Sequence, residues 1–429
     1  MPYDRFRSAS LTAPNLRTHL VAGAAALLAL AATATGVAQQ PVEAADATPG
    51  QVVEVTYEER LSAEQVQAAA AASFGRYGPP ETENAVDVYG LRFATTGLDG
   101  GTVVVPATLF VPVEPSRERA PLYVFGSGTT GLADVCAPSR EADLPAPLGD
   151  YRGYLAPYAA RGIVTVFPDY LGFEDPDRPQ AYFHAASEAH VLLDAARAVR
   201  TTFEEAIWMG TLEEAVVTGG YSQGGHAAFA AADRVADYAP EVPLAGAIGY
   251  AATTDVEALF REGPYYAPYV LAAWSSVYGV DRVRPKTVLA ERWLPSLQRE
   301  AVQVCVDRAQ QVYPFDVDAM FDAAFADSLR RGTLDATHPE LHALFRENRT
   351  GLSGHGLPAL VVQGGNDVIV HDATQERFVQ ALCGLGSDVR YLNDPVARHR
   401  DTRPAGFEAA VGWIHDRAAG VPAPSTCGE

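Results

Sequence analysis

The chain has 429 residues, of which 48% are hydrophobic and 20% charged, a balance that indicates a globular rather than a disordered protein. Its length suffices for one large α/β domain with an insertion, or for two ordinary domains. The formal net charge of −21 argues against nucleic acid as a partner, because binding phosphates requires a basic surface.

Residues 1–38 have the pattern of a secretory signal peptide. An apolar run begins at Leu20, and Gly36-Val37-Ala38 offers small residues for cleavage before Gln39. The run follows a basic segment with Arg5, Arg7 and Arg17. An uncleaved single-span anchor is the alternative, which the alanine-rich second half of the run disfavours. We therefore expect an exported protein, extracellular or periplasmic, in which residues 39–51 form a flexible leader.

Export places the four cysteines in an oxidising compartment, where an even number suggests disulfides. Four cysteines allow three pairings, and none has the C-x-x-C spacing of a zinc site. Cys383 and Cys427 are close in sequence, which would leave Cys136 to pair with Cys305. We favour this pairing over the alternative of four reduced, buried thiols.

The first elements form a hairpin-like opening. A short strand at 52–57 precedes a helix that starts at a capping box of Ser62 and Gln65 and runs to about residue 73. Two strand-like runs follow at 85–95 and 102–113, separated by a glycine-containing turn.

Continuous apolar strands then alternate with helices. We expect strands at 121–125, 163–167, 216–219 and 244–250, helices at 151–161 and 185–200 and after residue 222, and a loop at 168–173. Such alternation is typical of a mostly parallel sheet flanked by helices on both faces.

The alternation stops at about residue 256. Residues 257–355 contain helix-like segments and no convincing buried strand. A segment of this length is too long for a plain crossover between two strands and indicates a helical cap or lid. The sheet resumes near 357–363, followed by a helix at 374–385, a strand at 388–392 and a helix at 405–417. The α/β core would thus comprise residues 52–256 and 356–429.

The strand ending at residue 219 runs into a nucleophile-elbow pattern. Gly220, Ser222 and Gly224 fit G-x-S-x-G, with glycines where larger side chains would clash with the strand and helix beside the serine. A glycine-rich turn of a nucleotide-binding fold is the alternative, but the G-x-G-x-x-G spacing is missing. Ser222 is therefore our predicted nucleophile.

A serine nucleophile needs a base and an acid, which follow it in the order acid, then histidine, in α/β-hydrolases. Asp367 comes directly after a buried strand, and His399 lies between the last strand and the last helix. Asp367 could instead cap the helix 374–385, but Asp372 fits that role better. We predict His399 as the base and Asp367 as the acid. The other histidines suit these roles less well, and His226 is expected to pack on the elbow helix.

Backbone N–H groups must also stabilise the oxyanion that develops on the substrate. The N–H of Gln223, directly after the nucleophile, is one expected donor. The second is expected from the glycine-rich loop 126–131, where we favour Thr129 with Thr130 as the alternative.

Several segments resemble the secretory lipase family of α/β-hydrolases. They are Gly128-Thr129-Thr130-Gly131 with residues 133–139, Pro168-Asp169-Tyr170-Leu171-Gly172, residues 220–226, and Tyr238-Ala239-Pro240-Glu241. The resemblance covers roughly residues 50–420 and implies a secreted carboxylic ester hydrolase with a helical cap and two disulfides. Ser127 and Arg398 depart from it, since relatives often carry histidine and glycine there.

Together these features predict an esterase or lipase that acts through an acyl-enzyme on lipid or other small-molecule esters. The mechanism requires no metal or cofactor, and contact with a lipid interface would be transient. Acyl transfer or peptide hydrolysis on the same fold, and an inactive binding module, are the alternatives. An aromatic set in the cap could line an acyl site, although such spacing is more often core: Phe260, Tyr265, Tyr266, Tyr269, Trp274 and Tyr278.

Overall fold

The computed structural model describes residues 47–82, 84–113, 119–144, 148–175, 177–206 and 209–428. The predicted signal peptide and the first part of the predicted leader lie outside these residues. Within the described ranges, no helix combines the length and apolarity needed to cross a membrane.

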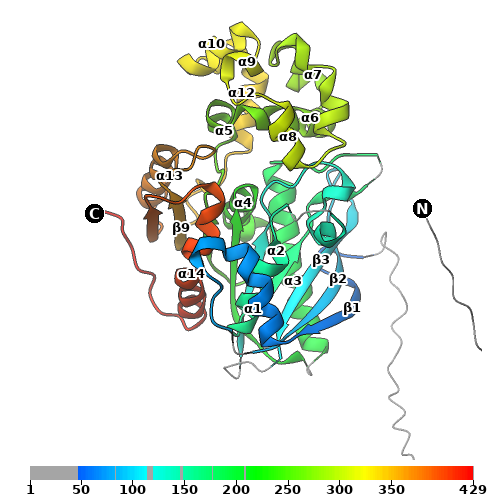
Figure 1. The fold of residues 1–429 in the computed structure, drawn as a ribbon, viewed down its shortest axis with the longest axis vertical. Coiled ribbons are helices and arrows are strands. Elements are labelled where there is room, and N and C mark those ends of the chain that lie inside the picture. Colours follow the sequence, from blue (N-terminus) through cyan, green and yellow to red (C-terminus); the bar gives the residue numbers. More distant parts are fainter. Residues whose placement is uncertain are drawn as a thin grey trace, which may run out of the picture. The chain divides into compact units, whose positions relative to one another are not determined.

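A sheet forms the centre of the domain (Figure 1). It has nine strands in the order β1-β2-β3-β5-β4-β7-β8-β9-β10. The six strands from β5 to β10 in this order run parallel, and β1, β2 and β3 pair antiparallel at one edge. The predicted mostly parallel sheet is therefore confirmed. The strands are β1 (Val52–Leu61), β2 (Val86–Thr96), β3 (Thr102–Pro112), β4 (Ala120–Gly126), β5 (Val164–Pro168), β7 (Leu212–Tyr221), β8 (Leu244–Tyr250), β9 (Ala359–Gly364) and β10 (Val389–Asp394).

Helices cover both faces of the sheet. Successive residues of a strand point to opposite faces, so Leu122 and Val124 of β4 pack in one core cluster and Tyr123 and Phe125 in the other. The first cluster includes residues of α3 (Ala185–Glu205), α4 (Gln223–Tyr238) and α13 (Asp372–Gly384). The second includes residues of α1 (Ala63–Phe74), α2 (Tyr151–Ala160) and α14 (Thr402–Ala418).

The start of α1 matches its sequence pattern. Ser62 Oγ accepts a hydrogen bond from Gln65 N at 3.3 Å, and Ser62 N donates to Gln65 Oε1 at 2.8 Å. This reciprocal capping box satisfies two backbone donors that a helix start otherwise leaves open.

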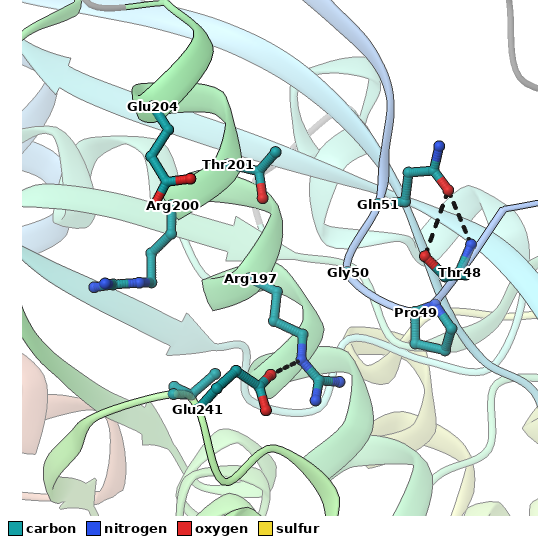
Figure 2. A pocket seen from close by; sticks show the side chains of 10 residues that line it. Thr48, Pro49, Gly50, Gln51, Arg197, Arg200, Thr201, Glu204 and Glu241 are labelled. Atoms are coloured by element: carbon teal, nitrogen blue, oxygen red, sulfur yellow. Dashed lines mark hydrogen bonds and ion pairs between the residues drawn. The ribbon is translucent and has the colours of Figure 1, made fainter.

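Two local predictions are wrong. Residues 47–51, expected in an exposed leader, pack on the core, because Gly50 N donates to Ala94 O of β2 and Ala47 and Gly50 are buried. Figure 2 shows this segment beside Arg197 of α3, where the two line a surface cavity of about 450 Å³. Part of the expected loop 168–173 forms a short strand, β6 (Leu171–Glu174), outside the main sheet, where Leu171 O accepts from Ala181 N.

The chain between β8 and β9 is helical. In Figure 1 these helices, coloured green to yellow, stand together above the sheet: α5 (Val256–Glu262), α6 (Ala267–Tyr278), α7 (Val280–Val283), α8 (Val306–Val312), α9 (Val317–Met320), α10 (Ala323–Arg331), α11 (Leu334–Thr337) and α12 (Pro339–Glu347). We call residues 257–355 the insertion. Five of the six aromatic side chains noted in its sequence are buried in the core cluster, and only Tyr278 is partly exposed. These side chains therefore pack in a core that the insertion shares with the α/β domain.

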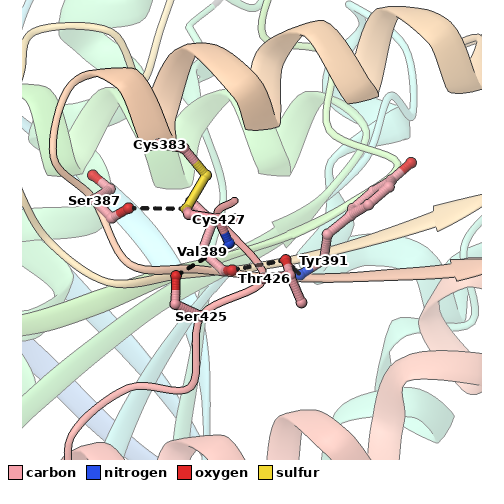
Figure 3. Close-up of a disulfide and its surroundings, with 7 residues drawn as sticks. All are labelled: Cys383, Ser387, Val389, Tyr391, Ser425, Thr426 and Cys427. Carbon is pink, nitrogen blue, oxygen red and sulfur yellow. Dashed lines mark hydrogen bonds between the residues drawn. A yellow bond between two sulfur atoms is a disulfide. The ribbon is translucent and has the colours of Figure 1, made fainter. Parts of the chain in front are cut away.

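Two disulfides have the pairing favoured from the sequence. Cys136–Cys305 joins the segment after β4 to the insertion, where Gly131 and Cys305 also form a β-bridge. Cys383–Cys427 fastens the C-terminal segment beside β10, where Thr426 N donates to Val389 O (Figure 3). The second disulfide thus covers part of the edge strand of the sheet.

The two disulfides should differ in their contribution to stability. Residues 136 and 305 are 169 apart in sequence and residues 383 and 427 are 44 apart, and a longer closed loop restricts the unfolded chain more. We expect Cys136→Ala/Cys305→Ala to lower the free energy of unfolding by about 2–5 kcal/mol, roughly 1 kcal/mol more than Cys383→Ala/Cys427→Ala. Urea unfolding of both variants measures the difference, and an equal or reversed order would contradict it.

Candidate active site

Ser222 lies at the sharp turn between β7 and α4. Its backbone has φ +55° and ψ −110°, a conformation that non-glycine residues rarely adopt. Ser222 N donates to Tyr250 O of β8, and Ser222 O accepts from the N–H groups of Gly225, His226 and Thr253. These bonds hold the strained residue at the carboxyl end of the central strands.

The flanking glycines allow a close backbone approach. A Cβ on Gly224 would lie 1.9 Å from Gly126 O, at the end of β4. A Cβ on Gly220 would lie 2.2 Å from the backbone of Gly224. Because the obstacles are backbone atoms, no side-chain rotation could relieve the clash. Glycine is therefore required at both predicted elbow positions.

The three predicted triad residues form one hydrogen-bonded chain. Ser222 Oγ lies 3.0 Å from His399 Nε2, and His399 Nδ1 lies 2.7 Å from Asp367 Oδ2. All three residues are buried. Since the carboxylate accepts, Nδ1 carries the proton and Nε2 faces Ser222 with its lone pair.

Asp367 and His399 follow adjacent parallel strands. Asp367 comes after β9, and its Oδ1 accepts from Ile369 N at 2.8 Å and Val370 N at 3.0 Å, which fixes the carboxylate. The sequence had suggested that Asp372 caps α13, and this prediction is wrong, because the helix has no side-chain cap. Asp372 lies in the first turn, where its carboxylate accepts from Tyr391 and Asn393 of β10.

The two predicted oxyanion donors border the serine. Gln223 is the first residue of α4, and Thr129 lies in the loop after β4, the strand beside β7. Gly128 N donates to Tyr151 Oη at 2.6 Å, which removes it as a donor. Within the described residues, the backbone N–H groups of Gln223 and Thr129 have no protein acceptor.

The loop after β4 is anchored to the end of β5. Tyr170 Oη donates to Ser127 O at 2.8 Å, and Asp169 accepts from Ser139 N at 2.9 Å and Ser139 Oγ at 2.5 Å. Burial raises the pKa of Asp169 to about 7, although the hydrogen bonds from Ser139 oppose the rise. Tyr182 Oη lies 2.6 Å from Thr129 Oγ1 and holds the loop from a third side.

Some contacts at this site were not expected from the sequence. The Tyr221 ring packs 4.9 Å from the imidazole of His399, measured between centroids. Glu188 of α3 is hydrogen-bonded to the side chains of Gln223 and His226. His226 is buried on α4 as expected, but nothing in sequence marked Glu188, since an acidic residue in the first turn of a helix is common.

The described residues contain no group of three or more histidine, cysteine, aspartate or glutamate side chains that could hold a metal ion.

The comparisons with known proteins agree with this architecture. Residues 152–426 match the sequence profile of the secretory lipase family. The chain belongs to this family. The resemblance expected from the motifs is thus confirmed, and family membership supports a carboxylic ester hydrolase.

Individual relatives are distant. A probable inactive lipase from Mycobacterium tuberculosis is 24% identical, covering 77% of this chain and 74% of its own length. A probable trichothecene esterase from Stachybotrys chartarum is 26% identical, and the match covers 77% of this chain and 68% of that protein.

Solved structures share the fold. The rice cell wall degrading esterase LipA from Xanthomonas oryzae superposes with a TM-score of 0.68 at 21% identity, covering 86% of this chain and 98% of that protein. Candida antarctica lipase A superposes with a TM-score of 0.63 at 20% identity, covering 89% and 85%. The predicted α/β-hydrolase fold is confirmed.

The elbow geometry predicts a position-specific response to an added methyl group. We expect Gly224→Ala to lower ester hydrolysis at least about 100-fold, because the elbow must move away from β4 and misplaces Ser222. Gly412→Ala is the control, since its Cβ would meet nothing within 4 Å in the middle of α14. It should raise the free energy of unfolding by about 0.5–1 kcal/mol and leave activity unchanged. Full activity of Gly224→Ala would contradict the packing argument.

Proposed function

We propose that this protein is a secreted serine ester hydrolase in which Ser222 attacks the ester carbonyl. The observation that carries the proposal is the hydrogen-bonded chain from Ser222 through His399 to Asp367. His399 Nε2 takes the proton from Ser222, and the ionised Asp367 stabilises the imidazolium that forms. The N–H groups of Gln223 and Thr129 stabilise the oxyanion.

The reaction then passes through an acyl-enzyme. His399 returns its proton to the leaving alcohol, and the acyl group stays on Ser222. A water molecule then attacks the acyl carbon while His399 Nε2 removes its proton, and a second oxyanion forms. When this oxyanion collapses, the bond between the acyl carbon and Ser222 Oγ breaks, His399 returns the proton to Ser222 Oγ, and the acid leaves. Within the described residues, the two N–H donors have no competing protein acceptor, which supports this role.

We take the proposed substrate class from the names of the relatives. Of the four relatives described above, two are named as esterases, one as a lipase and one as a probable inactive lipase, so we propose small-molecule or lipid esters, acylglycerols included. We further propose that the insertion acts as a cap. Its Glu262 accepts from His371 N and Thr374 Oγ1, and these residues follow Asp367. Its disulfide to Cys136 fastens it near the loop that carries Thr129.

Export to an extracellular or periplasmic location is part of the proposal. The family is described as secretory, and two disulfides are stable in an oxidising compartment. The signal peptide predicted at residues 1–38 would provide export.

Substitutions in the triad test the reaction. We expect Ser222→Ala to lower kcat for p-nitrophenyl esters by about 10⁴–10⁶-fold, and Asp367→Asn by about 10⁴-fold because the imidazole loses its tautomer. Asp372→Asn is the matched control, since Asp372 follows Asp367 closely in sequence and, among the described residues, its carboxylate accepts hydrogen bonds only from Tyr391 and Asn393 of β10. Circular dichroism should be unchanged in all three. Turnover retained by Ser222→Ala would refute the mechanism.

Other chemistry on the same site can be distinguished. One relative is named as an inactive lipase, so labelling of Ser222 by a fluorophosphonate separates an active site from a binding module that retains the fold. Product analysis with alcohol and amine acceptors separates hydrolysis from acyl transfer. Rates over short to long acyl esters, with and without an oil interface, separate esterase from lipase.

A further inference from the structure

A buried polar network lies behind the proposed oxyanion donor. Glu188, in the first turn of α3, is only 1% exposed, and its carboxylate has three donors. Glu188 Oε1 accepts from Gln223 Nε2 at 2.8 Å and from Phe183 N at 3.1 Å. Glu188 Oε2 lies 2.5 Å from His226 Nδ1. Gln223 and His226 are three residues apart, so a single carboxylate holds the first turn of α4 at two points.

The hydrogen-bond partners of His226 indicate which of its ring nitrogens carry a proton. Its Nε2 lies 2.7 Å from the carbonyl oxygen of Asn348, which can only accept, so Nε2 carries a proton. The contact between Nδ1 and the Glu188 carboxyl requires a second proton shared between them. The pair is therefore neutral overall and brings no net negative charge toward the oxyanion that would form at Gln223 N.

The network continues into the insertion. Asn348 follows α12, and its Nδ2 donates to Tyr278 Oη of α6 at 2.8 Å and to Leu344 O at 3.0 Å. Asn348 Oδ1 accepts from Ala185 N, the first residue of α3, at 2.9 Å. Helices of the insertion thus support the side chains that hold the start of α4.

We infer that Glu188 is a positioning residue for the oxyanion donor Gln223 N–H, supported by His226 and Asn348. This inference rests on the proposed function. The direction of a backbone N–H at the N-terminus of a helix is set by the orientation of the first helical turn. Electrostatic stabilisation of an oxyanion falls steeply when such a donor moves. Anchoring the Gln223 side chain and His226 to α3 fixes this direction without any contact between Glu188 and substrate.

Two variants on the same helix separate positioning from stability. Asp194 of α3 is also buried; its carboxylate accepts from Thr95 Oγ1, from Arg197 Nη1, and from Tyr238 Oη at the end of α4 opposite to the elbow. We expect Glu188→Ala and Asp194→Ala both to lower the Tm. When p-nitrophenyl butyrate is the substrate and the assay temperature is well below the Tm of each variant, Glu188→Ala should lower kcat about 10–100-fold with little change in KM. Asp194→Ala should keep the wild-type kcat.

A transition-state mimic provides the second readout. A boronic acid that adds to Ser222 forms a tetrahedral anion, so its Ki should rise in Glu188→Ala by the factor by which kcat/KM falls. Glu188→Gln should restore most of kcat, because the amide oxygen can accept from Gln223 and the amide nitrogen can donate to His226 Nδ1. Gln223→Ala keeps the backbone N–H but removes the anchor, and should lower kcat as Glu188→Ala does, which provides the test if Glu188→Ala does not fold.

The outcomes are distinguishable from those for the proposed function. If Ser222→Ala abolishes turnover but Glu188→Ala loses no more kcat than Asp194→Ala, the positioning role is overturned and the hydrolase stands. A wild-type kcat in Gln223→Ala has the same consequence. If the wild-type protein shows no turnover that depends on Ser222, the proposed function fails and the positioning role with it.

Discussion

The close contact between the start of α4 and the end of β4 is the constraint on which this site depends. Gly224 lies so near Gly126 O that only a hydrogen atom fits between them. This contact turns the chain sharply enough to give Ser222 its positive φ and to bring the N-terminus of α4 to the carboxyl ends of the strands. Because the loop with Thr129 begins at Gly126, the same contact places that loop beside the serine.

The neighbouring strands position the other groups of the candidate site around Ser222. Adjacent parallel strands β9 and β10 end beside one another, so Asp367 and His399 meet although they are distant in sequence. On the other side, Tyr170 and Asp169 at the end of β5 hold the loop after β4. The groups of the candidate site therefore follow four parallel strands, Thr129 after β4, Ser222 after β7, Asp367 after β9 and His399 after β10, and residues after a fifth strand, β5, hold the loop with Thr129.

The insertion is integrated with this core. Its disulfide to Cys136 and the hydrogen bond from His226 to Asn348 connect it to two segments that border Ser222. A buried polar network with every member paired favours one arrangement, because an unpaired buried group is costly. The insertion accordingly shares an apolar core with the α/β domain and also makes polar contacts that reach the elbow.

The sequence by itself determined the parallel sheet, the helical insertion, the elbow and the likeness to secretory lipases. These features depend on local patterns: apolar strands alternating with helices, glycines at fixed spacing, and motifs in a fixed order. It also selected Ser222, Asp367 and His399 as candidates, because polar residues that follow buried parallel strands gather at one edge. Only the tertiary structure decided that these three are within hydrogen-bond distance, that Ala47 and Gly50 pack on the core, and that Glu188 holds Gln223 and His226. The reason is physical: these contacts join residues far apart along the chain, and their partners are of residue types too common for the sequence alone to mark them.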